Sequence, residues 1–422
     1  MEKLRSHRAT VDGLSRGLDS LPVEIVGEIF AAAAHDDYGI ETTLSISATD
    51  RKWRAIALAT PALWARVMFD EETNYSLDLL AIFLERSMAA PLTIKFDAPE
   101  NKTRIALPIL LNHAHRWLSF EAETDDLTLL LDIFIQTLPH PATLPMLESF
   151  IILHSSEDPS VRYLPPIHFP AILDLHIPDS HRNIDFNFLG SQLKDIFFTP
   201  MSLAGLGSCV NLRNLRCNIQ ADMVMEQNLR LSFPRLEELE LYFDQSGWPL
   251  VSRLFQAMVS CTPRRLEMGI RCYDSDTRAR TSLNPPATLL SRVEHLTVRV
   301  TGDVVCSPIN RSNVEQILEK CYALEEIDFS NMPEMRLLLR RMTKTFPPKV
   351  ASLSIRNGGA LAAELRNLLV HRRKEGKEPL EALHLVQCGK RTEQTLARFE
   401  ELVEYVSWDE EDIDDEDDEY EK

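Results

Sequence analysis

The amino-acid sequence predicts an α/β protein in which a small helical module is followed by a long series of short strands. Three observations predict this architecture. An apolar pattern with helical spacing runs from Leu21 to about residue 59, and a different apolar motif recurs from about residue 116 onward. In addition, 44% of the 422 residues are hydrophobic, which is enough to bury at least one large core.

The N-terminal part of the chain changes character at Leu21. The preceding residues 1–18 are polar and basic and show little apolar periodicity, so we expect a mobile arm there. Apolar residues then recur every fourth position through Leu21, Ile25 and Ile29, which predicts an amphipathic helix. Pro22 is compatible with the first turn of this helix, because that turn does not use the hydrogen-bond donor that proline lacks.

A second helical pattern follows a polar stretch at residues 35–43, carries Trp53, and ends at the Thr60–Pro61 pair. Residues 19–64 therefore predict a compact helical module. A module of this size buries too little surface to be comfortably stable alone, so we expect it to dock on a partner or on the rest of the chain. We interpret residues 65–115 as a linker with joining helices.

The region 116–405 repeats the motif L-x-x-L-x-L or a close relative. Each copy predicts a short strand followed by a helical or irregular return, and the intervals of about 19 to 31 residues are typical of leucine-rich repeats. We therefore expect an irregular, horseshoe-shaped leucine-rich-repeat solenoid. The nine full copies begin at Leu147, Ile172, Leu193, Leu212, Leu236, Val293, Leu324, Val350 and Leu380, and degenerate copies lie near Leu118 and Leu266.

The alternative fold is a doubly wound sheet, because strands and helices alternate there in a similar way. Nucleotide-binding versions of that fold usually need a glycine-rich loop. This chain has only 14 glycines, and the Gly205–Gly207 pair lacks the third glycine of such a loop. The repeat architecture is therefore the preferred prediction.

The sequence predicts no catalytic residue, no cofactor and no metal site. Phosphate-loop, serine-hydrolase and zinc-protease motifs do not occur. His113 and His115 alternate, but a metal site needs three or four converging ligands, so a surface or packing role is expected. A calcium loop beginning at Asp412 would place Asp417 where glycine is required. We expect a binding protein that is not an enzyme.

Charge is distributed unevenly along the chain, which carries a net charge of -19. The segment 409–421 contains eleven carboxylates and no basic residue, so we expect residues 406–422 to form a disordered acidic tail. This tail either keeps the protein soluble or binds basic proteins. The overall charge argues against nucleic-acid binding, because phosphate backbones would be repelled.

The basic run His371–Lys374 has two interpretations. It could serve as a nuclear-import or anion-binding patch, or its cations could stabilise the end of the apolar helix that precedes them. Seven cysteines without a Cys-x-x-Cys pair predict reduced, packed thiols. No secretory signal and no membrane span is evident, so we expect no membrane association and a location in the cytoplasm, the nucleus or both.

Two blocks of the N-terminal module form a recognisable combination of motifs. The first is Leu21-Pro22-x-Glu24-Ile25 with Ile29-Phe30, and the second is Arg51-Lys52-Trp53 with Thr60-Pro61-x-Leu63-Trp64. With these residues the module resembles an F-box, of the kind found in the F-box-like proteins abundant in fungi. The resemblance continues through Phe83–Ser87, Pro91-Leu92 and His115–Trp117. It departs from the family at Thr49-Asp50, where a hydrophobic residue and a cysteine are usual.

The resemblance implies a substrate-recognition adaptor of a Skp–cullin–F-box ubiquitin ligase. Its F-box would bind a Skp-type subunit and, through it, a cullin, while its repeats would hold an unknown target protein. The resemblance implies these Skp-binding residues: Leu21, Pro22, Ile25, Ile29, Phe30 and Trp53. The alternatives are a repeat scaffold without a role in ubiquitination, and a module whose apolar residues merely form a helical cap on the repeats.

Target binding would use side chains that point outward between the core positions of the repeat strands. The alternation of a strand places these residues on the face opposite the core leucines. The expected target-binding residues are Phe197, Arg216, Glu240, Tyr242, Arg299, Arg356 and His384.

Overall fold

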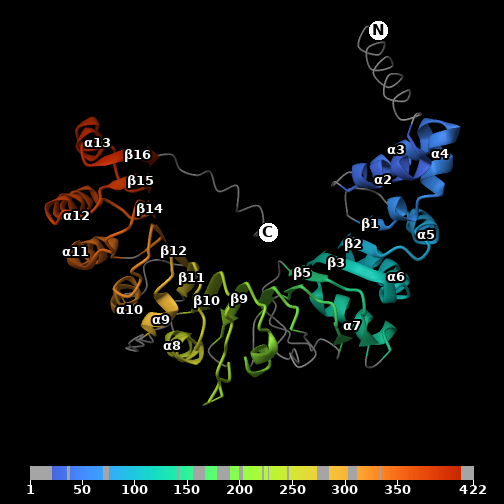
Figure 1. The fold of residues 1–422 in the computed structure, drawn as a ribbon, viewed down its shortest axis with the longest axis horizontal. Coiled ribbons are helices and arrows are strands. Elements are labelled where there is room, and N and C mark those ends of the chain that lie inside the picture. The colour runs from blue at the N-terminus through green and yellow to red at the C-terminus, as the bar shows by residue number, and fades with distance from the viewer. Residues whose placement is uncertain are drawn as a thin grey trace, which may run out of the picture. The chain divides into compact units, whose positions relative to one another are not determined.

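Figure 1 shows the computed structural model of the chain, in which helices alternate with parallel strands. The α/β class predicted from the sequence is confirmed. Contacts divide the chain into two compact units, with unit 1 formed by residues 1–156 and 165–172 and unit 2 by residues 157–164 and 173–422. The structure describes residues 21–35, 39–69, 76–139, 142–154, 167–177, 191–198, 203–220, 223–226, 228–244, 247–272, 285–302, 311–332 and 334–409. The predicted basic arm, and the predicted acidic tail from residue 410 onward, lie outside these residues.

Unit 1 begins with the helical module. Its elements are α2 (Val23–Ala33), α3 (Gly39–Thr49), α4 (Arg51–Leu58) and the 3-10 helix η1 (Pro61–Trp64). The expectation of one continuous second helix was wrong, since Asp50 has an extended backbone (φ -153°, ψ 178°) that separates α3 from α4. The polar stretch expected at residues 35–43 is also partly helical, because α3 already begins at Gly39.

The sheet of unit 1 follows this module. Its strands pair in parallel in chain order and are β1 (Arg66–Phe69), β2 (Leu92–Asp97), β3 (Trp117–Thr124) and β5 (Ser149–His154). The helices α5 (Leu77–Arg86), α6 (Glu100–Leu111) and α7 (Leu127–Thr137) lie along one side of it (Figure 1). The short elements are η2 (Ala114–Arg116), β4 (Ala142–Thr143) and β6 (Ile167–His168). The region 65–115, expected to hold only joining helices, therefore also supplies β1 and β2, whose short apolar runs lack the repeated motif.

Motifs that extend the F-box resemblance converge in unit 1. Trp64 is fully buried, lies edge-on to Phe83 at 5.1 Å, and has the guanidinium of Arg86 over its ring at 4.4 Å. Arg116 is 4% exposed and donates a hydrogen bond to the Ser87 hydroxyl at 3.0 Å. Residues from three separate sequence motifs thus support one another in a single core.

In the described part of unit 2, ten strands pair in parallel in chain order. Each full motif copy in this unit places its fourth position on a strand, and the core leucines of neighbouring strands align in register, as Leu239 does with Leu215 and Leu266. The strands are β7 (Asp174–His176), β8 (Asp195–Phe198), β9 (Asn214–Ile219), β10 (Glu238–Asp244), β11 (Arg265–Cys272), β12 (His295–Gly302), β13 (Glu326–Ser330), β14 (Ser352–Arg356), β15 (Leu380–Val386) and β16 (Val403–Asp409).

Helices lie between most of these strands, on one side of the sheet of unit 2 (Figure 1). The buried core rows face them, so the intervening side chains occupy the opposite side, which we call the open sheet face. β16 continues to Asp409, four residues beyond the expected end of the repeats, and Trp408 on this strand is 4% exposed. The helical elements are η4 (Ala204–Ser208), α8 (Trp248–Ala257), α9 (Ala287–Leu290), α10 (Arg311–Leu318), α11 (Met335–Thr345), α12 (Ala362–Lys374) and α13 (Glu393–Glu400).

The six cysteines within the described residues are free and buried, as the sequence predicts. Burial raises the pKa of the Cys261 thiol to about 11 and that of Cys321 to about 12, so both are protonated at neutral pH. In the described part of the chain, no helix combines the length and the apolar character needed to cross a bilayer.

Candidate functional site

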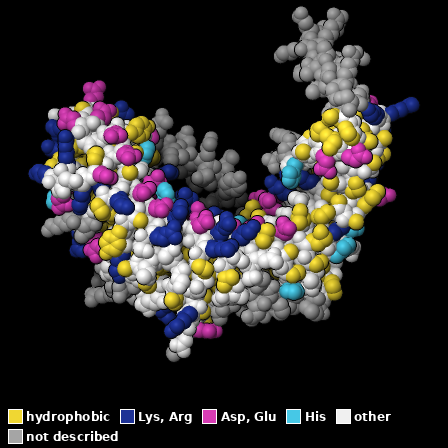
Figure 2. Space-filling view, in the orientation of Figure 1, with side chains coloured by type: hydrophobic (Ala, Val, Ile, Leu, Met, Phe, Trp, Pro, Cys, Tyr) yellow, Lys and Arg dark blue, Asp and Glu magenta, His cyan; other side chains and the backbone are white. Residues whose placement is uncertain are grey.

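The helix α2 separates its apolar residues into two sets. Val26 and Phe30 are buried, whereas Leu21, Ile25 and Ile29 retain 39%, 47% and 39% of their surface. Ile25 and Ile29 are four residues apart and therefore lie on one side of the helix, while Leu21 stands two residues before the helix begins at Val23, which is itself exposed. We call Leu21, Ile25 and Ile29 the α2 stripe; Figure 2 shows hydrophobic side chains (yellow) at the surface of the helical module.

Packing inside the module holds the α2 stripe outward. Phe30 is 2% exposed and its ring lies 4.9 Å from that of the half-buried Trp53. On the same buried side, Gly27 approaches the Thr60 turn so closely that an added Cβ would lie 2.8 Å from the Thr60 hydroxyl. Of the six residues expected to bind Skp, Phe30 therefore supports Trp53 from within, while Leu21, Pro22, Ile25 and Ile29 are at the surface.

The two residues that depart from the F-box pattern have a local structural role. The Asp50 carboxylate accepts a hydrogen bond from the Trp53 amide at 2.8 Å and caps the N-terminus of α4. The Thr49 hydroxyl donates to the carbonyl of Ser45 at 2.8 Å inside α3. Asp50 thereby fixes the start of the helix that carries Trp53.

The open sheet face of unit 2 holds all seven residues expected to bind a target. Phe197, Arg216 and Glu240 are register partners on β8, β9 and β10, in the row that follows the core leucines. His384 lies in the same row on β15, while Tyr242, Arg299 and Arg356 lie two residues further along their strands. Basic and acidic side chains lie side by side over these strands in Figure 2. Their placement agrees with the geometric expectation, and target binding itself stays a prediction.

A charged network occupies the centre of this face. The guanidinium of Arg216 lies 3.0 Å from the carboxylate of Glu240, and that of Arg299 lies 3.6 Å from Glu267. The Tyr242 hydroxyl reaches both carboxylates, at 3.2 Å from Glu240 and 3.3 Å from Glu267. We call these five residues the Arg–Glu–Tyr network.

In the Arg–Glu–Tyr network the carboxylates are largely buried and the guanidinium groups are exposed to solvent. The side chains of Glu240 and Glu267 are only 11% and 12% exposed, whereas those of Arg216 and Arg299 are 43% and 54% exposed. Arginine carries five donors, so one carboxylate does not saturate it. The exposed N–H groups of this face can therefore bind carboxylates or phosphates of a partner.

Burial changes the protonation behaviour of the network. It raises the pKa of the Glu240 carboxyl above its ordinary value, although Arg216 acts in the opposite direction. Burial, followed by the two neighbouring carboxylates, also raises the pKa of the Tyr242 hydroxyl. Tyr242 is therefore protonated at neutral pH and donates to both glutamates. Nearby His176 packs edge-on to Phe197, and burial together with Arg216 lowers its pKa.

Two members of this arrangement were missed by the sequence interpretation. Glu267 and Gly269 lie on β11, which derives from a degenerate copy of the motif. A Cβ added to Gly269 would lie 2.3 Å from the Tyr242 ring, so the missing side chain is what allows the ring to lie across the neighbouring strand. The signal that could have found both residues was the alternation Leu266-x-Met268-x-Ile270.

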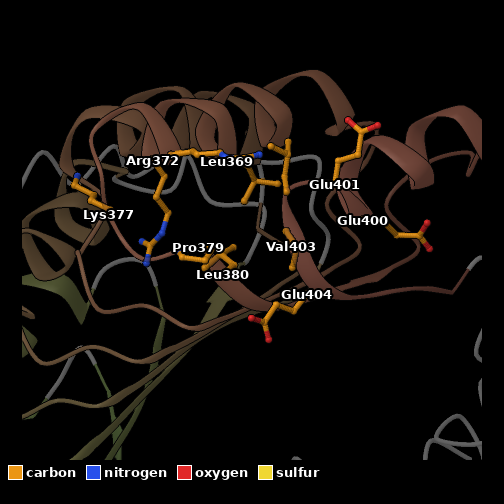
Figure 3. Close-up of a pocket in the computed structure, with 11 residues that line it drawn as sticks. Leu369, Arg372, Lys377, Pro379, Leu380, Glu400, Glu401, Val403 and Glu404 are labelled. Atoms are coloured by element: carbon orange, nitrogen blue, oxygen red, sulfur yellow. The ribbon is translucent and has the colours of Figure 1, made fainter.

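The basic run of α12 borders a cavity of about 340 Å³ between α12 and β16. Figure 3 shows Arg372 and Lys377 on one side, and Glu401 and Glu404 on the other. Arg372 itself is 3% exposed and is hydrogen-bonded to backbone carbonyls, for example to that of Val350 at 2.6 Å. This residue therefore supports the structural interpretation of the run.

Metal binding has no geometric support in the part of the chain that is described, where no three His, Cys, Asp or Glu side chains converge. His113 is half-buried and His115 exposed. Comparison with known proteins gave no match, either among protein-family models or among curated protein sequences. The surfaces themselves define the candidate sites: an apolar helix stripe in unit 1 and a polar sheet face in unit 2.

Proposed function

We propose that this chain is a substrate-recognition adaptor of a Skp–cullin–F-box ubiquitin ligase. The α2 stripe docks a Skp-type subunit, and the open sheet face, as part of a leucine-rich-repeat solenoid, holds the target. Catalysis is then positional, because the adaptor raises the concentration of the target near another protein's active site.

The observation that carries the proposal is the exposure of Ile25 and Ile29 on one side of α2, with Leu21 exposed just before the helix begins. Large aliphatic side chains at helical spacing are the usual anchors of a helix that binds an apolar groove. The burial of Phe30 against Trp53 anchors the α2 backbone, so docking orders only the exposed side chains of the stripe. The convergence of the resemblance-bearing residues around Trp64 further supports an F-box-like module.

The experiment titrates the full chain with a purified Skp-type adaptor and measures the binding affinity by calorimetry. Buried aliphatic anchors each contribute about 2 kcal/mol, so Leu21→Ala combined with Ile25→Ala should weaken binding at least about tenfold. Because both residues are exposed, circular dichroism of the variant should match that of the wild type.

A matched control exists in the same unit. Ile105 on α6 and Ile135 on α7 are 52% and 37% exposed, so Ile105→Ala with Ile135→Ala removes equivalent apolar surface elsewhere. Binding by this control should equal that of the wild type. A folded wild-type chain that does not bind the adaptor at micromolar concentration would rule out the ligase role.

The alternative is a binding scaffold without a role in ubiquitination. Asp50 favours this alternative, since a charged N-cap stands where the F-box family usually has an apolar residue and a cysteine. Affinity purification with mass spectrometry separates the two functions. Recovery of a Skp-type subunit and a cullin supports the ligase adaptor, and recovery of other partners without them supports the scaffold.

A further inference from the structure

One row of the open sheet face leads directly to the start of the acidic tail. Arg299, Ser330, Arg356, Val386 and Asp409 are successive register partners on β12 to β16. We call this set the arginine row. Asp409 ends β16, and the tail of residues 410–422 continues from it. The chain therefore leaves the sheet in line with two arginines.

The two arginines of the arginine row are free to bind further anions. The Arg356 side chain is exposed and has no ion-pair partner among the described residues, while that of Arg299 is 54% exposed and only 3.6 Å from one carboxylate. Lys390, just beyond β15, is also exposed. Asp409 is the one carboxylate of the row itself, so this row attracts negative charge.

The opposite ends of the same strands carry charges of both signs. The carboxylates Glu294, Glu325, Glu326 and Glu381 lie there beside the exposed cations Arg264, Arg265, Arg292 and Lys349. An acidic segment therefore meets like charges at the N-terminal ends of the strands, whereas the arginine row at their C-terminal ends has a single carboxylate of its own.

The tail has the length and the charge to occupy the arginine row. Its thirteen residues (422 minus 409) carry ten carboxylates and a single cation, Lys422. Extended at about 3.3 Å per residue it reaches about 43 Å, whereas strands about 4.8 Å apart place Arg356 about 10 Å and Arg299 about 19 Å from Asp409. The tether also gives the tail a local concentration in the millimolar range.

We propose that residues 410–422 bind the arginine row of the same molecule and act as an internal acidic ligand of the open sheet face. An external partner of this face must then displace the tail, which favours partners with an acidic segment of their own. This inference does not depend on the adaptor function, because it concerns only unit 2 and its tail.

The experiment is carbodiimide cross-linking of the full chain, which joins a carboxylate to an amine without a spacer, read out by mass spectrometry. Arg299→Lys keeps the charge and introduces a reactive amine within the arginine row. The matched control is Arg264→Lys, at the exposed residue just before β11 and five residues before Gly269, the register partner of Arg299. Both positions are within reach of the tail, since position 264 is about 30 Å from Asp409.

The proposal requires that tail carboxylates couple at position 299 at least about fivefold more than at position 264 in about 50 mM salt. This preference should disappear in about 0.5 M salt, because exposed ion pairs are screened. Native Lys390 should couple to the tail in both variants. Equal coupling at positions 299 and 264, coupling at Lys390 without coupling at position 299, or no coupling at all would each overturn the proposal.

Discussion

Arg372 makes a testable contribution to the stability of unit 2. Its guanidinium donates hydrogen bonds to the carbonyls of Pro347 and Pro348, both at 3.0 Å, of Val350 at 2.6 Å and of Glu378 at 2.5 Å. Arg372→Met keeps the apolar stem but removes all of these donors. Leaving buried carbonyls without donors costs about 1–3 kcal/mol for each group, with losses that are not additive. We expect the free energy of unfolding to fall by about 3–4 kcal/mol.

The assay is equilibrium unfolding in urea, followed by circular dichroism. The control is Arg373→Met, because Arg373 occupies the same last turn of α12 but is exposed. This control should change the free energy of unfolding by less than about 0.5 kcal/mol. A loss below about 1 kcal/mol for Arg372→Met, or equal losses for the two variants, would refute the assignment of Arg372 to folding and would favour the surface-patch interpretation of the basic run.

Four further outcomes are expected. Asp50→Ala should lower stability by about 1 kcal/mol in thermal melting because the cap of α4 is lost, whereas Asp50→Asn should be nearly neutral. Gly269→Ala should cost about 1–3 kcal/mol because its Cβ meets the Tyr242 ring, and the cost should vanish in a Tyr242→Ala background. Burial raises the pKa of Glu240 above 4.5, so its stabilising contribution is complete below that pH and is lost as the pH rises through the folded-state pKa. Glu240→Gln should therefore become more stable relative to the wild type as the pH rises above 4.5, measured by urea unfolding at several pH values. Removal of residues 410–422 should leave the melting temperature unchanged in about 0.5 M salt, where contacts of the tail with the arginine row are screened, because a segment with so many carboxylates and so few apolar residues builds no packed core.

The sequence predicted the strands of unit 2 because the repeated motif directly encodes a strand. In β10, for example, Leu239 and Leu241 are buried and Glu240 lies between them on the other face. Period-two alternation is a local property, so it is readable without knowledge of neighbouring strands. The strand β1 was missed because its run is only four residues long, and β2 was missed because Leu92, Ile94 and Phe96 alternate without the rest of the repeated motif.

The candidate sites were predictable only in part. The outward direction of Arg216 and Tyr242 follows from alternation, but their partners depend on the register between strands. This register cannot be read from the sequence. The role of Gly269 is likewise visible only in the structure, where its missing side chain leaves room for the Tyr242 ring. Similarly, both Ile29 and Phe30 were expected to bind Skp, and only the packing against Trp53 decides which of them is buried.

The last strand of unit 2 has a consequence for solubility. Among the described strands, β16 stands at the end of the strand order and pairs with β15 alone, so no described strand covers the backbone groups of its other edge. Such an edge invites the strands of other molecules and promotes aggregation. Glu404 on β16 is exposed, and a run of carboxylates begins where the strand ends. Repulsion between these like charges opposes edge-to-edge pairing of two copies, so shortening or neutralising this run should increase aggregation even where folding is unaffected.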